Sequence, residues 1–115
     1  MRKVIVTDYL APPADIEQRE LDGMARVHCL RARKNDELRG KLTEADAIIV
    51  FHEITLPADL IAEADKCRIF VRCVVGFYPV DIQAAGAKGI PVCNVPDYGV
   101  DEVADHAIGL MLACN

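Results

Sequence analysis

The chain has 115 residues, a formal net charge of −5 and 52% hydrophobic residues, which is typical of one small globular domain and leaves no room for a second. The acidic balance, with no basic run longer than Arg31 to Lys34, argues against nucleic acid or an anionic membrane as a partner. No apolar run reaches membrane-spanning length, and the amino end meets Asp8 too soon for a signal peptide, so we expect a cytoplasmic protein. The 5 cysteines lack metal-binding spacing and mostly fall in apolar patterns, so we expect reduced, buried thiols.

Short apolar runs alternate with short helical patterns along most of the chain. The expected strands are Lys3–Asp8, Ala25–Leu30, Ala45–Phe51, Ile69–Val75 and Ile90–Val95. The expected helices between them are Asp15–Leu21, Asp36–Leu42, Pro57–Ala64 and Val80–Ala85, the last closed by Gly86 or Gly89. This alternation without a repeat predicts an α/β fold, a flavodoxin-like doubly wound parallel sheet of about five strands, followed by a C-terminal helix.

The candidate site follows from where strands end. Ligands of parallel sheets lie beyond the carboxyl ends of the strands, so we expect the Val75-Gly76-Phe77 turn to lie beside the 94–99 loop. Either Gly76 simply ends a strand, or it allows a close approach or backbone conformation that a side chain would obstruct. His52 either lines the same cleft or is a solvated loop residue. Arg72 either clamps a carboxylate or points under a covering helix and pairs with an acid.

Asp8, at the end of the first strand, invites comparison with receiver domains of the same fold, which bind magnesium and accept phosphate there. The rest of that pattern is missing, because the third strand ends Val50-Phe51-His52 without an aspartate and no lysine follows the fifth strand. We therefore expect no metal site.

The stretch from Val74 to Asp105 resembles the D-isomer-specific 2-hydroxyacid dehydrogenases. Their G-x-G-Y-D-N-x-D turn corresponds to residues 74–81, their A-A-x-x-x-G-I-x-V-x-N-x-P motif to residues 84–96, and their V-A-[ED] motif to Val103-Ala104-Asp105. Residues 51–56 and 71–72 look closest to the branch that includes the C-terminal binding protein corepressors. The chain departs from the pattern at Val74, where glycine is usual, and at Tyr78-Pro79, where Asp-Asn is usual.

The resemblance implies a small 2-hydroxy or 2-keto acid as substrate and NAD or NADP as cofactor of the complete parent enzyme. It assigns the substrate carboxylate to the amides of Val75 and Gly76, with Arg72 and His52 as further candidate substrate-binding residues. Val75 and Val103 match peripheral cofactor positions, whereas no residue matches the family's catalytic arginine, acid and histidine. The chain also has no G-x-G-x-x-G fingerprint, so we expect no catalytic residue and no cofactor binding by this chain alone.

Residues 1–99 are thus expected to form an incomplete flavodoxin-like substrate-binding domain, and residues 100–115 the start of an interdomain or dimerisation helix. Apolar residues cover more than one face of that helix, which predicts a homo-oligomer paired through it. The function we expect is that of a substrate-domain fragment of an NAD-dependent D-2-hydroxyacid dehydrogenase, inactive by itself. The alternative is a protein- or peptide-binding module derived from that domain, since corepressor members of the family dock short peptides on it.

Overall fold

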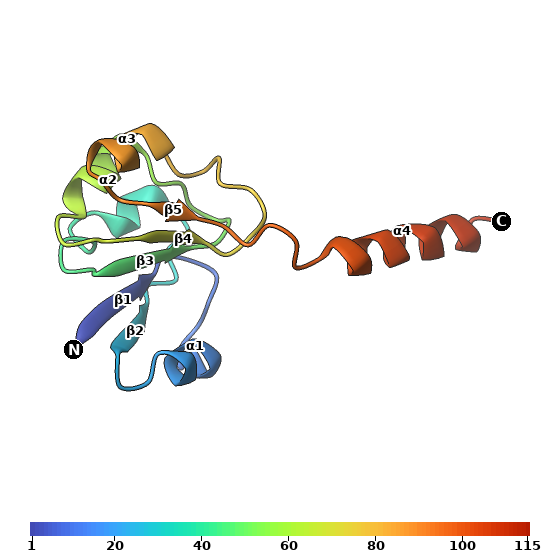
Figure 1. Cartoon of the computed structure of the whole chain (residues 1–115), viewed down its shortest axis with the longest axis horizontal. Coiled ribbons are helices and arrows are strands. Elements are labelled where there is room, and N and C mark those ends of the chain that lie inside the picture. Colours follow the sequence, from blue (N-terminus) through green and yellow to red (C-terminus); the bar gives the residue numbers. More distant parts are fainter.

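Five parallel strands form a single sheet in the order β2-β1-β3-β4-β5 in the computed structural model, which describes residues 1–115 (Figure 1). The strands are β1 Arg2–Val6, β2 Ala25–Cys29, β3 Ala47–Val50, β4 Phe70–Arg72 and β5 Val92–Cys93. Every neighbouring pair is parallel, and each strand lies within one of the expected apolar runs or overlaps it. Because β1 lies between β2 and β3, the chain winds in both directions from the middle, which confirms the predicted doubly wound α/β fold.

Short helices connect the strands and cover the two faces unequally. They are α1 Asp15–Glu20, the 3₁₀ helix η1 Asn35–Leu38, α2 Ala58–Glu63 and α3 Ile82–Ala87. Figure 1 shows α1 beside β2, well away from α2 and α3. Successive strand residues point to opposite faces, so Ile5 joins the buried cluster under α2 and α3, whereas Val4 lies near Leu21 and Met24, just after α1.

The main core lies between the sheet and the helices α2 and α3. It contains 17 buried residues, among which Ile48, Leu60 and Phe70 have no exposed surface. Burying a side chain of this size contributes about 1.5–3 kcal/mol. The core therefore fixes the central strands, and with them the positions of the loops that leave their carboxyl ends.

Several predicted boundaries are wrong for local reasons. The predicted helix 36–42 is only one 3₁₀ turn, although Leu38 and Leu42 are both fully buried. Helix α3 begins later than predicted because the Asp81 side chain accepts a hydrogen bond from the Ala84 N–H at 3.0 Å and caps the helix there. Gly89, with a φ of +71°, follows this helix and favours its termination, whereas Gly86 lies inside it.

Helix α4, Val100–Ala113, leaves the sheet and projects from it (Figure 1), so that the molecule measures 55 × 32 × 24 Å. All of its residues are exposed. Its large apolar side chains have exposed fractions between 54% and 69%; they are Val100, Val103, Ile108, Leu110, Met111 and Leu112. This helix therefore presents apolar surface that nothing else in the chain covers.

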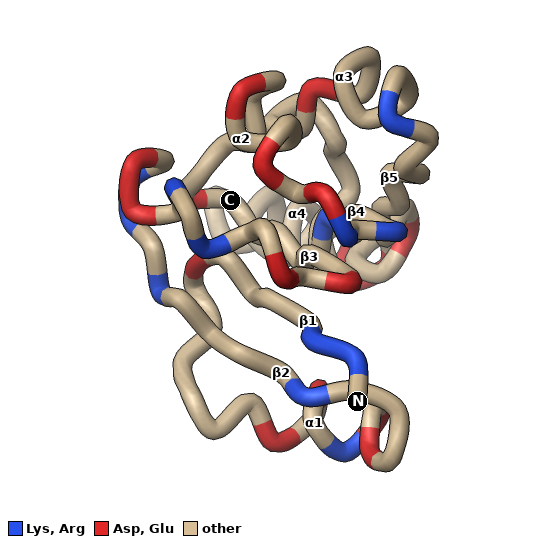
Figure 2. Tube along the Cα trace, turned by 90° about the vertical axis from the view of Figure 1, so that its left-hand side faces the viewer, with Lys and Arg blue, Asp and Glu red and all other residues tan.

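Charged residues are distributed around the molecule, and Figure 2 shows basic and acidic segments interspersed along the trace. Exposed ion pairs such as Arg39–Asp59, at 2.6 Å, join neighbouring loops and helices. No helix combines the length and the apolar character that a membrane crossing requires.

The prediction of mostly buried thiols is wrong. All the cysteines are free, but only Cys67 is buried; Cys29 and Cys73 are half-buried, and Cys93 and Cys114 are exposed. Burial raises the pKa of the Cys67 thiol above its ordinary value.

Candidate functional site

The buried polar and charged residues all lie at the carboxyl ends of the two strands β1 and β4. Thr7 and Asp8 follow β1 and are 0% exposed, and Arg72 ends β4 and is 3% exposed. Burying a polar group is costly unless it finds a partner, and burying a charge is costlier still. The hydrogen bonds that these side chains form with the backbone therefore explain why they are buried at this edge of the sheet.

Asp8 holds the loop that follows β3. Its carboxylate accepts hydrogen bonds from the N–H groups of Phe51 at 2.9 Å, His52 at 2.9 Å and Glu53 at 2.6 Å, and from the Thr7 hydroxyl at 2.7 Å. Consecutive amides on one carboxylate fix the path of the loop. This role was not predicted for Asp8, which the sequence suggested only as a possible metal or phosphate residue. The available signal was a single acidic residue at the end of an apolar run.

Arg72 joins the same loop to the turn after β4. Its Nε donates to the Phe51 carbonyl and its Nη1 donates to the Gly76 carbonyl at 2.7 Å. Its guanidinium carbon also lies 5.8 Å from the centre of the Tyr78 ring. The alternative in which Arg72 pairs with an acid is wrong, since Arg72 forms no ion pair in the chain. A direct contact with a substrate carboxylate stays a prediction, but these bonds already make Arg72 a positioning residue.

The turn from Val74 to Tyr78 has bound carbonyls and free amides. The carbonyls of Val74, Val75, Gly76 and Phe77 accept hydrogen bonds from Val95 N–H, Asn94 Nδ2, Arg72 Nη1 and Val80 N–H respectively. None of the N–H groups of residues 75–78 donates to a partner within the chain. In a trans peptide the N–H points away from its carbonyl, so anchoring the carbonyls directs the amides elsewhere. Consecutive free N–H groups of this kind are suited to binding an anion.

The loop after β5 lies beside this turn, as predicted. The Asn94 Nδ2 donates to the Val75 carbonyl at 2.6 Å, and the Val95 N–H donates to the Val74 carbonyl at 3.1 Å. Asn94 was not among the predicted site residues, although it stands in the matched N-x-P motif. Its contact gives it a structural role in shaping the turn.

His52 lies at the same edge of the sheet and is exposed. Its ring centre lies 5.0 Å from that of Tyr9, which also lies 5.2 Å from the Phe51 ring. The loops after β1 and β3 therefore carry a small aromatic group beside the turn. Substrate binding by His52 stays a prediction.

Gly76 occupies a position with a close neighbour rather than a left-handed backbone. A Cβ at this residue would lie 3.3 Å from Cδ1 of Tyr78, and φ is not in the left-handed range. The Tyr78 side chain is 86% exposed and has space to move. The expected special backbone conformation is therefore wrong, and the one close neighbour of this glycine is an exposed ring that can move aside.

The two residues predicted to lie near a cofactor are brought together in one hollow. Val75 and Val103 both line a cavity of about 460 Å³ at the base of α4, with Pro96, Tyr98 and Ala107 among the other lining residues. Most of these residues are apolar, so the hollow offers contact but few hydrogen-bonding groups. The cofactor contact itself stays a prediction.

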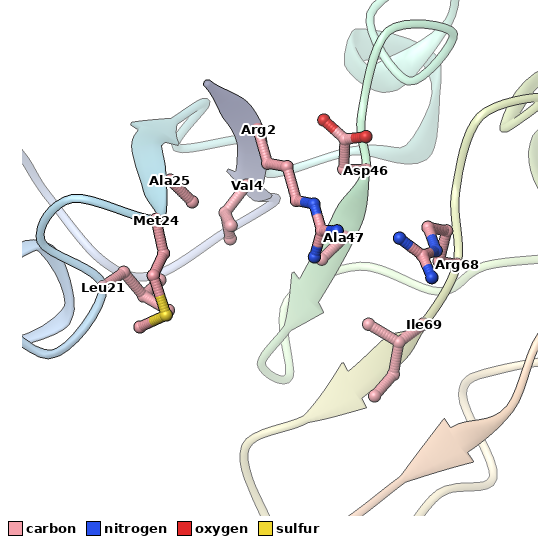
Figure 3. A pocket seen from close by; sticks show the side chains of 9 residues that line it. All are labelled: Arg2, Val4, Leu21, Met24, Ala25, Asp46, Ala47, Arg68 and Ile69. Atoms are coloured by element: carbon pink, nitrogen blue, oxygen red, sulfur yellow. The ribbon is translucent and has the colours of Figure 1, made fainter.

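A second hollow, of about 370 Å³, lies at the opposite, amino edge of the sheet (Figure 3). Arg2, Asp46 and Arg68 line this hollow together with apolar residues, and Figure 3 shows the Arg2 side chain extending to Ala47. No group of three or more His, Cys, Asp and Glu side chains is arranged to hold a metal ion.

A doubly wound sheet with a turn of free amides at its carboxyl edge defines an α/β domain suited to a small anionic ligand. The family described as D-isomer specific 2-hydroxyacid dehydrogenase, catalytic domain, matches residues 4–109. The chain belongs to this family.

Individual relatives agree with this assignment. The chain is 35% identical over 118 residues to D-3-phosphoglycerate dehydrogenase of Mycobacterium tuberculosis, a match that covers 97% of this chain and 21% of the relative. Cofactor (NAD+)-bound 3-phosphoglycerate dehydrogenase of Entamoeba histolytica superposes with a TM-score of 0.80 at 26% identity, covering 96% of this chain and 38% of that one. NADPH-dependent glyoxylate/hydroxypyruvate reductase of Sinorhizobium meliloti in complex with citrate gives a TM-score of 0.76 at 28% identity, covering 97% and 34%. This chain thus spans about a fifth of the length of the curated relative and about a third of each solved one.

Proposed function

We propose that this chain is the part of a D-2-hydroxyacid dehydrogenase that binds the carboxylate of the substrate, a small 2-hydroxy or 2-oxo acid. The observation that supports this is the turn 74–78, where the carbonyls are anchored and the amides are free. A carboxylate bound to the N–H groups of Val75 and Gly76 needs no charged side chain. Arg72 and Asp8 serve this site by fixing the turn and the loop beside it.

The chain by itself is proposed to be inactive in hydride transfer. The apolar hollow that contains Val75 and Val103 fits an edge of a nicotinamide cofactor, NAD or NADP, but offers no cradle for its phosphates. No acid–base pair matching the family's catalytic residues stands in the chain either. Residues 1–99 are therefore proposed as the substrate domain, with the cofactor domain supplied by the rest of a parent enzyme.

Titration followed by amide nuclear magnetic resonance tests the carboxylate site directly. Pyruvate added to the labelled chain is expected to shift the signals of Val75, Gly76 and the adjacent Phe77, whereas the neutral analogue hydroxyacetone leaves them unchanged. Asn94→Asp is expected to weaken the response, because the new charge loses the hydrogen bond to the Val75 carbonyl and repels an anion. Arg68→Met, at the far edge of the sheet, is the control that retains binding. Shifts confined to other regions would contradict the proposed site.

Helix α4 is proposed to pair two copies of the chain. Its apolar side chains are more than half exposed, and an exposed apolar patch of this kind favours association in water. Light scattering is expected to find a dimer for the whole chain and a monomer for a version that ends at Gly99. A dimer that survives this truncation would contradict pairing through α4.

Three finer predictions remain. We further propose, from the resemblance of residues 51–56 and 71–72, that the chain is nearest the corepressor-like branch, and that the protein is cytoplasmic. A peptide-binding module is the alternative function. A screen of short peptides against the chain, read by the same amide signals, discriminates it from the carboxylate site.

A further inference from the structure

An aromatic group stands beside the carboxylate turn, formed by Tyr9, Phe51 and His52. The Tyr9 ring centre lies 5.2 Å from that of Phe51 and 5.0 Å from that of His52. Tyr9 is 61% exposed, so much of its ring faces solvent and is free to contact a ligand. The group thus combines exposed aromatic surface with mutual ring contacts that restrict its motion.

The backbone beneath these rings is held by hydrogen bonds to Asp8. Tyr9 has a φ of +64°, which is uncommon for an aromatic residue, and the Leu10 N–H donates to the Asp8 carbonyl at 2.7 Å just beyond it. The Asp8 carboxylate accepts the N–H groups of both Phe51 and His52. The rings therefore project from a fixed base rather than from a loosely tethered loop.

One guanidinium sets the distance between this group and the turn. Arg72 donates through Nε to the Phe51 carbonyl and through Nη1 to the Gly76 carbonyl. The loop that carries Phe51 and His52 is therefore joined through one side chain to the turn that contains Gly76. An acid whose carboxylate binds the turn then lies at the same edge of the sheet as the aromatic group.

The loops that carry these rings offer no positive charge to a ligand. Residues 9–14 and 51–56 contain no lysine or arginine, and their one charged residue is Glu53. Arg72 is buried and engaged with two carbonyls. The nearest basic residues along the sheet edge follow β2, the strand on the far side of β1; they are Arg31, Arg33 and Lys34.

We propose that the candidate site prefers 2-hydroxy and 2-oxo acids with a bulky apolar side chain, aromatic or branched, which contacts Tyr9, Phe51 and His52. Aromatic rings gain from stacking and from burial of apolar area, whereas the loops that carry them offer no lysine or arginine to a phosphate or second carboxylate. This inference rests on the proposed carboxylate site. The preferred ligand of this chain would then differ from 3-phosphoglycerate, the phosphorylated acid in the name of the mycobacterial relative.

The test titrates the whole chain with four acids: pyruvate, 4-methyl-2-oxopentanoate, phenylpyruvate and 3-phosphoglycerate. Binding is read from the amide signals of Gly76 and Phe77, and 2-phenylethanol is the neutral control for unspecific aromatic binding. Phenylpyruvate and 4-methyl-2-oxopentanoate are expected to bind about tenfold more tightly than pyruvate, a gain of the size that an aromatic contact supplies. Binding of 3-phosphoglycerate is expected to be no tighter than that of pyruvate.

Tyr9→Asn removes the central ring and suits the left-handed backbone, because asparagine tolerates that conformation. It is expected to abolish the preference for the bulky acids while leaving pyruvate binding unchanged. His28→Asn, which removes an exposed ring from β2, is the matched control and should retain the preference. An unchanged preference in Tyr9→Asn would overturn the assignment to this aromatic group.

The outcomes separate the two proposals. Equal binding of all four acids at Gly76 and Phe77 would overturn the side-chain preference and leave the carboxylate site standing. Tighter binding of 3-phosphoglycerate would overturn it in favour of a phosphate contact with Arg31, Arg33 or Lys34. Absence of binding by every acid would overturn the carboxylate site, and this inference with it.

Discussion

The two edges of the sheet use the same residue types for different purposes. At the amino edge, Arg2 and Arg68 are exposed beside an apolar hollow, and half-buried Asp46 accepts one backbone N–H, from Lys3 at 2.7 Å (Figure 3). At the carboxyl edge, Asp8 and Arg72 are buried and bound to the backbone of two loops. Burial makes the difference, because a charge cut off from water is stable only where the backbone supplies its partners. The carboxyl edge is therefore the preorganised one.

The largest expected effect contrasts the two aspartates. Asp8→Asn replaces a carboxylate that accepts several N–H groups with an amide whose own NH₂ would face them, and it should cost about 3 kcal/mol of unfolding free energy. Asp46→Asn, at the amino edge, should cost only about 1 kcal/mol, since it weakens one partly solvated bond. Urea unfolding of both variants measures this difference. Equal costs would show that the two edges do not differ as described.

The arginines give the next contrast. Arg72→Met leaves the carbonyls of Phe51 and Gly76 without their donors and should lower stability by about 2 kcal/mol. Arg68→Met removes an exposed charge with no ion pair and should change stability by less than about 0.5 kcal/mol. Arg72→Lys should not restore the loss, because an ammonium group cannot reproduce the planar fork that reaches both carbonyls. Full rescue by lysine would mean that charge alone matters here.

Two glycines allow a smaller contrast. Gly89→Ala should cost about 1 kcal/mol, because its φ of +71° is unfavourable for a residue with a Cβ. Gly76→Ala should cost about 0.5 kcal/mol or less, since its backbone is ordinary and the exposed Tyr78 ring can move aside. Thermal unfolding ranks the two. A larger cost at Gly76 would indicate that Tyr78 is held in place more firmly than its exposure suggests.

The smallest expected effect needs no substitution and compares how fast the individual cysteine thiols react. Cys67 precedes β4 and is 7% exposed, and burial raises its pKa, so less of it is thiolate at neutral pH. Iodoacetamide should therefore modify exposed Cys93 and Cys114 first and Cys67 last. Raising the pH should speed the reaction at Cys67, because more of its thiol is then ionised, but Cys67 should remain slower than the exposed thiols. Mass spectrometry of partly modified protein gives the order, and early modification of Cys67 would show that β4 opens readily at its amino end.

The sequence by itself determined the fold class and the adjacency of the two loops that form the candidate site. Each apolar run of buried-strand length became a strand, because such a segment is stable only inside a covered parallel sheet. The position of the turn at residues 75–77, and its neighbour after β5, followed from the rule that loops meet beyond the carboxyl ends of parallel strands. The motifs from Val74 to Asp105 added the family, which the comparisons confirmed.

Only the tertiary structure decided what the individual side chains do. Asp8 and the loop at residues 51–53 lie more than forty positions apart, and nothing local signals that one binds the other. The same holds for Arg72, whose two carbonyl partners come from different loops and whose burial is set by packing across the sheet. The short extent of η1 and the exposure of Cys93 were likewise fixed by neighbouring elements. The local sequence pattern indicates which segments favour a helix or a strand and which of their residues are buried. Hydrogen bonds between distant loops form only when the folded chain brings those loops together.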